Sequence, residues 1–239
     1  MMRFKVIINK WANFYFFVQN LSEWHFSNRK AYNLFWQEKP GELTSREQQA
    51  LKLFAKLHKR YPFGRDFYGQ IFFVSRDPLG ALGRKLPKKD FQSLEQTFLI
   101  FEDRFNLLYR KELPALQKWS KLLAKRLRGT MVGERLNTAL ARLYRTRPLR
   151  KMVKVHLLFS APDYSGGGAS EGDSITLEIS RYPFSKVNHA VGVIWHELIH
   201  LHFEKRYFLP MLKKTFRSDQ QSVSFIKEAA ASALLPSGV

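Results

Sequence analysis

The sequence of 239 residues contains no cysteine. This absence excludes disulfide-linked scaffolds, thiolate nucleophiles, cysteine-ligated zinc and iron–sulfur clusters. Any metal ion in this chain must therefore be held by histidine and carboxylate side chains.

Acidic residues are also scarce. The chain has 20 Asp and Glu against 40 Lys and Arg, which gives a net charge of +20 and a pI near 10.2. A small soluble domain usually carries a net charge of about 2–8 in magnitude. The excess predicts an acidic partner, which can be a nucleic acid, an anionic membrane surface or an acidic protein.

Long apolar runs are missing. The uncharged stretch at 11–22 is only 12 residues long and is interrupted by Asn13, Gln19 and Asn20. A membrane span needs about 18 or more consecutive apolar residues, and no small-residue cleavage pattern follows the N-terminal stretch. We therefore expect a cytoplasmic protein without a transmembrane span.

What is present is an ordinary globular composition, with 45% hydrophobic and 25% charged residues. Periodicity and turn residues predict an α+β fold. Strands are expected at 4–8, 70–75, 153–160 and 174–180. Helices are expected at 11–21, 44–61, 90–111, 114–128, 132–144, 185–207 and 222–235, with loops at 76–89 and 165–173.

Two regions differ in their pattern. Residues 1–150 are mainly helical and include a basic segment at 110–154, but no linker marks them as an independent domain. Residues 151–239 carry the predicted small mixed or antiparallel sheet and two late helices. We expect these regions to form one unit.

The motif that carries chemistry is His196-Glu197-Leu198-Ile199-His200. Histidines at i and i+4 lie about 40° apart on a helix, so both rings can reach one zinc ion. Glu197 is close enough to activate a water on the metal without binding the metal itself. The uncharged flanks favour a buried ligand helix, although a core helix with two hydrogen-bonded histidines has the same pattern.

A zinc site of this kind needs a third protein ligand. No histidine follows His202, which leaves Glu204, Asp219 and Glu228. Glu204 lies further along the same helix, and Asp219 lies in a polar segment typical of a solvated turn. Glu228 stands among alanines, where an unpaired carboxylate would be costly to bury. The alternative is that Glu228 is an exposed residue of an amphipathic helix.

The motif followed by Glu228 in an E-A-x-A helix resembles the gluzincin branch of zinc metallopeptidases, the thermolysin-like arrangement. The resemblance covers about 150–239 and implies a zincin-like catalytic region at 151–239 with a pair of active-site helices. It also implies that His196, His200 and Glu228 bind one Zn²⁺ ion and that Glu197 is the catalytic base.

The chain departs from that family at two points. The aspartate that thermolysin places three residues after its ligand glutamate is replaced by Ala231, so a partner for a ligand histidine must come from elsewhere. The oxyanion-stabilising residue has no matching motif. Its candidates are Tyr207, Tyr182, His189 and Tyr164.

The segments before the ligand helix suggest where a peptide binds. In zincins a sheet-edge strand pairs with the substrate, and 174–180 occupies that place, with Ile175, Leu177 and Ile179 as the substrate-edge residues. An interior strand is the alternative. The glycines at 166–168 lack a following G-K-[ST] and do not form a phosphate loop; they suit a mobile loop or a hairpin connection.

Most of the positive charge lies in 110–154, which has 14 basic residues and two acidic ones, Glu112 and Glu134. Here Lys118, Lys121, Lys125 and Arg128 share one face of a predicted helix. This basic patch can contact a nucleic acid or an anionic membrane, or it can simply be a solvated surface.

Together these features predict a zinc metallopeptidase that acts on a peptide or protein substrate. The alternative is a basic nucleic-acid-binding protein with a structural or regulatory metal site, or a protease that acts on nucleic-acid-bound proteins.

Overall fold

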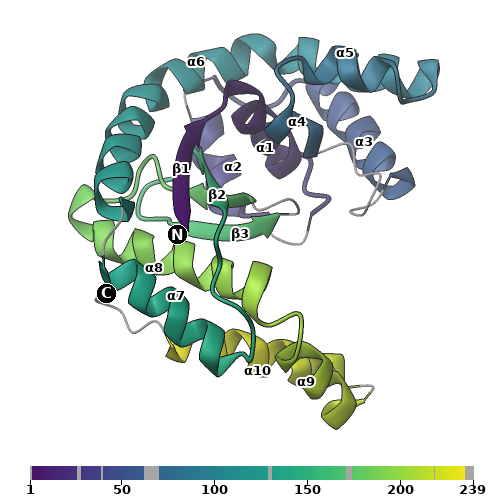
Figure 1. Ribbon diagram of the computed structural model, residues 1–239. Helices are drawn as coiled ribbons and strands as arrows, with labels where there is room; N and C mark the ends of the chain where they lie inside the picture. The colour runs from purple at the N-terminus through teal and green to yellow at the C-terminus, as the bar shows by residue number, and fades with distance from the viewer. Residues whose placement is uncertain are drawn as a thin grey trace.

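A four-stranded sheet lies at the centre of the computed structural model (Figure 1). Its strands are β1 (Arg3–Ile8), β2 (Met152–Leu158), β3 (Gly166–Ser170) and β4 (Ser174–Glu178), in the order β1-β2-β4-β3. The first three strands in this order are parallel, and β3 runs antiparallel to β4 at the edge. The mixed sheet confirms the predicted α+β fold, and β1 joins the N-terminal region to it.

The described residues are 2–25, 28–38, 40–61, 70–128, 131–170, 174–217 and 219–234. Before the second strand the helices are α1 (Lys10–Leu21), α2 (Lys30–Gln37), α3 (Ser45–Arg60), α4 (Ile71–Val74), α5 (Pro78–Gly83), α6 (Lys88–Leu127) and α7 (Met131–Leu143). After the sheet come the 3₁₀ turn η2 (Phe184–Lys186), α8 (Val187–Leu198), the π-helical turn η3 (Ile199–Phe203), α9 (Phe208–Phe216) and α10 (Gln220–Ala233). Pro62 as a helix end, the loop at 171–173 and residue 235 lie outside the described residues.

One face of the sheet packs on α8. Side chains alternate along a strand, so Phe4, Val155 and Leu177 point to the same side in the observed register. The ring of Phe4 meets Trp195 of α8 at 5.9 Å between centroids. The sheet therefore fixes the helix in which the His196–His200 motif begins.

The other face is covered unevenly. At the carboxyl end of β2, Asn13 of α1 donates a hydrogen bond to the Leu157 carbonyl oxygen and accepts one from the Phe159 N–H. Tyr32 of α2 donates to Glu178, and Phe73 of α4 contacts the His156 ring. At the amino end the side chains of Arg3 and Lys5 are exposed.

The longest element is α6, which has 40 residues and follows an arc around the sheet in Figure 1. The sequence predicted two helices, at 90–111 and 114–128, because proline lacks the N–H for an interior hydrogen bond. This prediction is wrong, since Pro114 lies inside one helix. Asp90 is in the first turn rather than at the cap, and its carboxylate binds Arg60 and Tyr61.

The strand predicted at 70–75 is also wrong, because residues 71–74 form the short helix α4. A short apolar run fits a buried strand or a buried helical turn equally well. Here Phe72 stacks between Tyr15 and Phe98, with centroid distances of 5.0 and 4.9 Å. The loop predicted at 76–89 contains α5, which Asp77 caps by accepting a hydrogen bond from the Gly80 N–H.

The predicted helix at 185–207 is interrupted. It is made of η2, α8 and η3, and α9 then follows where a loop through Pro210 was expected. Pro210 is the third residue of α9, and the N–H groups of the first helical turn have no partner within the helix. Proline is tolerated there for this reason.

No helix among the described residues has both the length and the apolar composition needed to cross a bilayer.

Candidate metal centre

The two motif histidines lie on consecutive turns of one helical segment. His196 belongs to α8 and His200 to the π-helical turn η3. Their Nε2 atoms are 3.0 Å apart. The flanking side chains Ile194, Trp195 and Leu198 are buried, so the motif helix is anchored in the core as its uncharged flanks predicted.

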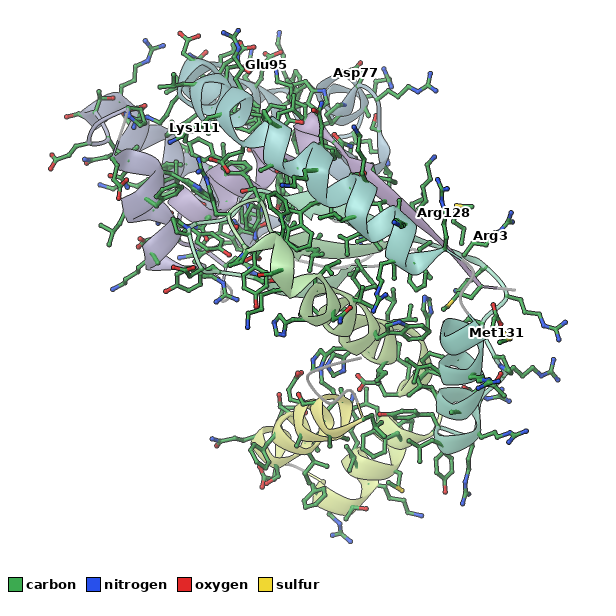
Figure 2. The ribbon with its side chains drawn as sticks, turned by 90° about the vertical axis from the view of Figure 1, so that its left-hand side faces the viewer. Arg3, Asp77, Glu95, Lys111, Arg128 and Met131 are labelled. Atoms are coloured by element: carbon green, nitrogen blue, oxygen red, sulfur yellow. The ribbon has the colours of Figure 1, made fainter. Side chains whose placement is uncertain are left out.

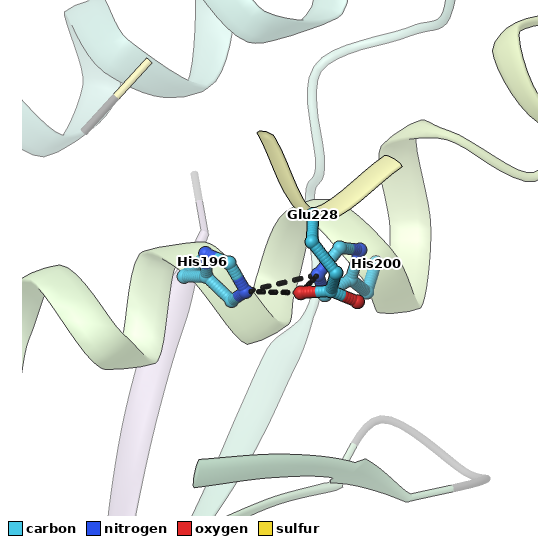
Figure 3. A group of neighbouring side chains, drawn as sticks. All are labelled: His196, His200 and Glu228. Carbon is cyan, nitrogen blue, oxygen red and sulfur yellow. Dashed lines mark hydrogen bonds and ion pairs between the residues drawn. The ribbon is translucent and has the colours of Figure 1, made fainter. Parts of the chain in front are cut away.

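Glu228 reaches this pair from α10. Figure 3 shows its carboxylate between the two rings, with Oε2 at 3.1 Å from Nε2 of His196 and 3.2 Å from Nε2 of His200. The side chain of Glu228 is still 50% exposed. The carboxylate therefore faces both solvent and the histidines. This combines the predicted position beside the histidines with the alternative of an exposed helix residue.

The donor atoms fit a zinc ion. Bonds of about 2.0–2.2 Å in tetrahedral geometry require donors about 3.3–3.6 Å apart. The observed separations of 3.0, 3.1 and 3.2 Å are within a few tenths of an ångström of that requirement. Two nitrogens and one oxygen also form a donor set that zinc prefers. His196, His200 and Glu228 are a group of side chains among the described residues that could hold a metal ion.

Glu204 fixes the orientation of His200. Its Oε2 lies 2.8 Å from Nδ1 of His200, and its side chain is only 4% exposed. Because an ionised carboxylate can only accept a hydrogen bond, Nδ1 carries the proton and Nε2 presents its lone pair to the centre. Glu204 thus lies outside the three converging side chains and provides His200 with the carboxylate partner that Ala231 cannot.

Lys227 connects the two carboxylates of the centre. Its Nζ lies 3.1 Å from Oε1 of Glu228 and 3.9 Å from Oε1 of Glu204. This ammonium group holds the free oxygen of Glu228 while the other oxygen faces the histidines. Sequence reasoning missed Lys227, because an ordinary Lys–Glu pair carries no signal until the fold is known.

The protonation of the ligands reflects their surroundings. Burial, and then the neighbouring His200, lower the pKa of His196. Burial alone would lower the pKa of His200, but the hydrogen bond and charge of Glu204 outweigh it and raise this pKa above its ordinary value. Although burial opposes the change, the charges of His200 and Lys227 bring the pKa of Glu228 below its usual value.

Glu197 lies against the edge strand. The Cβ of an alanine at position 167 would be 2.9 Å from Cγ of Glu197 and 2.7 Å from Cγ1 of Val193. Only glycine allows α8 to approach β3 so closely. The glycines expected to form a loop therefore belong to a strand, and they let the carboxylate next to the first ligand lie beside the sheet edge.

The substrate-edge prediction at 174–180 is wrong. The strand β4 lies between β2 and β3, and Ile175, Leu177 and Ile179 are fully buried. The alternation of apolar and polar residues indicated one exposed face, but α8 covers one side and Tyr32 covers Glu178 on the other. The edge at this side of the sheet is β3, where Gly167 is exposed.

The oxyanion candidates lie elsewhere. Tyr207 accepts a hydrogen bond from Arg145, the rings of Tyr182 and His189 are 5.6 Å apart, and Tyr164 lies under Arg29. None of these side chains hydrogen-bonds to a ligand within the described part of the chain. Asp219 caps α10 through the Ser222 N–H, as the predicted turn requires.

A cavity of about 360 Å³ borders the centre. It lies between η3, α9 and α10 and is lined by His200, Glu204, Leu209, Val223 and Lys227, among others. The larger hollow, of about 630 Å³, lies between α3 and α6 and contains none of the predicted site residues.

Comparison with known proteins identifies no family for this chain. Neither a scan against protein-family models nor searches of curated proteins and solved structures found a match. The function of the chain is therefore inferred from its own residues.

Replacing Glu204 with alanine is expected to lower zinc affinity by about 10–100-fold, because the ring of His200 loses the carboxylate that orients it. Competition with a chromophoric chelator measures this affinity. Glu204→Gln keeps an acceptor oxygen for Nδ1 and should lose less. Unchanged affinity in Glu204→Ala would contradict the assigned role.

Proposed function

We propose that this protein is a zinc-dependent metallopeptidase that hydrolyses peptide bonds with a water molecule. The observation that carries the proposal is the convergence of His196, His200 and Glu228, with donor atoms 3.0–3.2 Å apart, beside a helix carboxylate that faces a sheet edge. A zinc ion held by these residues supplies Lewis acidity, which lowers the pKa of water and polarises a carbonyl group.

Glu197 is the proposed catalytic base. Its carboxylate accepts a proton from the attacking water while the water oxygen bonds to the peptide carbonyl carbon. The same proton then passes from Glu197 to the amide nitrogen as the C–N bond breaks, which gives a free amine and a carboxylic acid. The acid then loses its proton to the amine or to solvent. Glu197 suits this role because it follows His196 in the sequence and would lie beside the metal without binding it.

The edge strand β3 is the proposed substrate platform. An extended peptide can pair with the free side of an edge strand through backbone hydrogen bonds. The absence of a side chain at Gly167 lets Glu197 lie directly against this edge. This arrangement supports a peptide as the substrate and transfers the platform role from β4 to β3.

Removal of the metal tests the proposal. The protein purified from zinc-replete medium is expected to contain one zinc ion per chain and to cleave casein. Dialysis against a chelator should abolish cleavage, and one equivalent of zinc should restore it. A chain without zinc after zinc-replete growth, or cleavage that persists in the metal-free protein, would refute the proposal. A cytoplasmic location is part of this proposal, and cell fractionation tests it.

A further inference from the structure

Four basic side chains form a row along the last turns of α6 and the residue that follows it. Lys118, Lys121, Lys125 and Arg128, which we call the α6 basic row, are all exposed. Their spacing of three, four and three residues keeps them within about 80° of the helix circumference. The structure therefore places the basic patch of the sequence on one solvent-facing surface.

The charge of this row is not neutralised within the described part of the chain. The two acidic residues of segment 110–154 are engaged elsewhere: Glu112 accepts hydrogen bonds from Ser180 and Arg181, and Glu134 accepts one from the Met2 N–H. The Nζ of Lys118 lies over the ring of Phe184, 4.0 Å from its centroid. No ion pair of the described residues includes a member of the row.

The start of β1 adds positive charge at the end of the row. Figure 2 shows Arg3 and Arg128 at the same end of the molecule. In the parallel pair of β1 and β2, Lys5 stands opposite Lys154. Like charges opposite one another destabilise a sheet, and a bound anion would relieve this repulsion. Two segments distant in sequence therefore contribute to one basic surface.

The apolar side of α6 distinguishes a nucleic acid from an anionic membrane, the two partners that the sequence left open. A helix that binds a membrane surface inserts its apolar face into the lipid. Here Leu116, Trp119 and Leu123 are fully buried in the protein core, so the turns of α6 that carry the row have no apolar face to insert. Only their charge is available to a partner.

The length of the row can be compared with the phosphate spacing of a nucleic-acid duplex. The row covers ten residue steps, or about 15 Å along the helix, and one DNA strand presents a phosphate about every 3.4 Å of duplex axis. The row is therefore about as long as four phosphates of one strand measured along the duplex axis. We propose that the α6 basic row and the adjoining start of β1 bind the phosphate backbone of double-stranded DNA without reading its sequence.

The experiment compares two variants with the same net charge. In the row variant Lys118, Lys121, Lys125 and Arg128 are all changed to glutamine. In the control variant the same change is made at exposed cations of α3, which are Arg46, Lys52, Lys56 and Lys59. Binding to a labelled 20-base-pair duplex is measured by fluorescence anisotropy between 20 and 200 mM salt, with a chelator present so that the metal plays no part.

The wild type should bind with an affinity that falls steeply with salt. Because each phosphate contact contributes about 0.9 to the slope of log K against log salt, the row variant should lose between three and four from the magnitude of this slope. It should also bind at least 10-fold more weakly at 100 mM salt, while the control variant stays within about 3-fold of the wild type.

Three results would overturn the inference. They are the absence of duplex binding at 20 mM salt, an equal loss in both variants, and a preference for phosphatidylserine vesicles over the duplex that the row variant abolishes. The last result would assign the surface to a membrane. Circular dichroism of both variants verifies that the fold is retained.

Discussion

Glu197→Gln is expected to lower casein turnover by about 10²–10⁴-fold, the usual contribution of a general base. Glutamine has nearly the same shape as glutamate but cannot accept the proton of the attacking water. Because Glu197 is not a ligand, zinc content should remain at one ion per chain. The measurement pairs initial cleavage rates with metal analysis of the same sample.

A matched control separates this effect from a general loss of charge. Glu102 lies on the exposed side of α6, and Glu102→Gln should cleave casein at the wild-type rate. Wild-type turnover in Glu197→Gln would remove this residue from the mechanism. Loss of zinc in the same variant would instead show that Glu197 supports the metal.

Glu228→Ala is expected to have the second large effect, through loss of the metal. Removal of a carboxylate that orients a ligand already costs about 10–100-fold in affinity, so removal of a ligand should cost more than about 100-fold. Isothermal titration of zinc into the metal-free protein measures this change. Cleavage should fall with zinc occupancy.

The same variant has a second readout in thermal stability. A ligand that binds only the folded chain stabilises it by about 2.7 kcal/mol at 100 times its Kd. Zinc should therefore raise the Tm of the wild type and of Gln220→Ala, an exposed control on the same helix, but not that of Glu228→Ala. An equal increase in all three proteins would place the metal elsewhere.

The sequence predicted that His196, His200 and Glu228 converge, because their geometry is local or chemically constrained. The separation of His196 and His200 follows from helix periodicity alone. Glu228 followed from the lack of a later histidine and from the apolar helix around it. The supporting role of Glu204 was also within reach of the sequence, since it lies four residues after His200 and thus on the same helix face.

What the sequence could not predict depended on tertiary packing. Nothing local distinguishes β4 from β3 as the edge strand, because that order depends on which strand pairs with β2. The glycines of β3 have low strand propensity, and they are explained only by the approach of α8. Likewise Phe72 lies in a helical turn because Tyr15 and Phe98 stack on it, and neither is its neighbour in sequence.

The chain changes phase between η3 and α9. Phe203 and Phe208 are five residues apart, and in an unbroken α-helix they would point about 140° away from each other. Both rings nevertheless contact Tyr144, at centroid distances of 6.3 and 5.5 Å. Residues 204–207 form turns rather than a continuous helix, and Tyr207 has a φ of −127°. This break, just after the turn that carries His200, lets both rings pack on the same side chain.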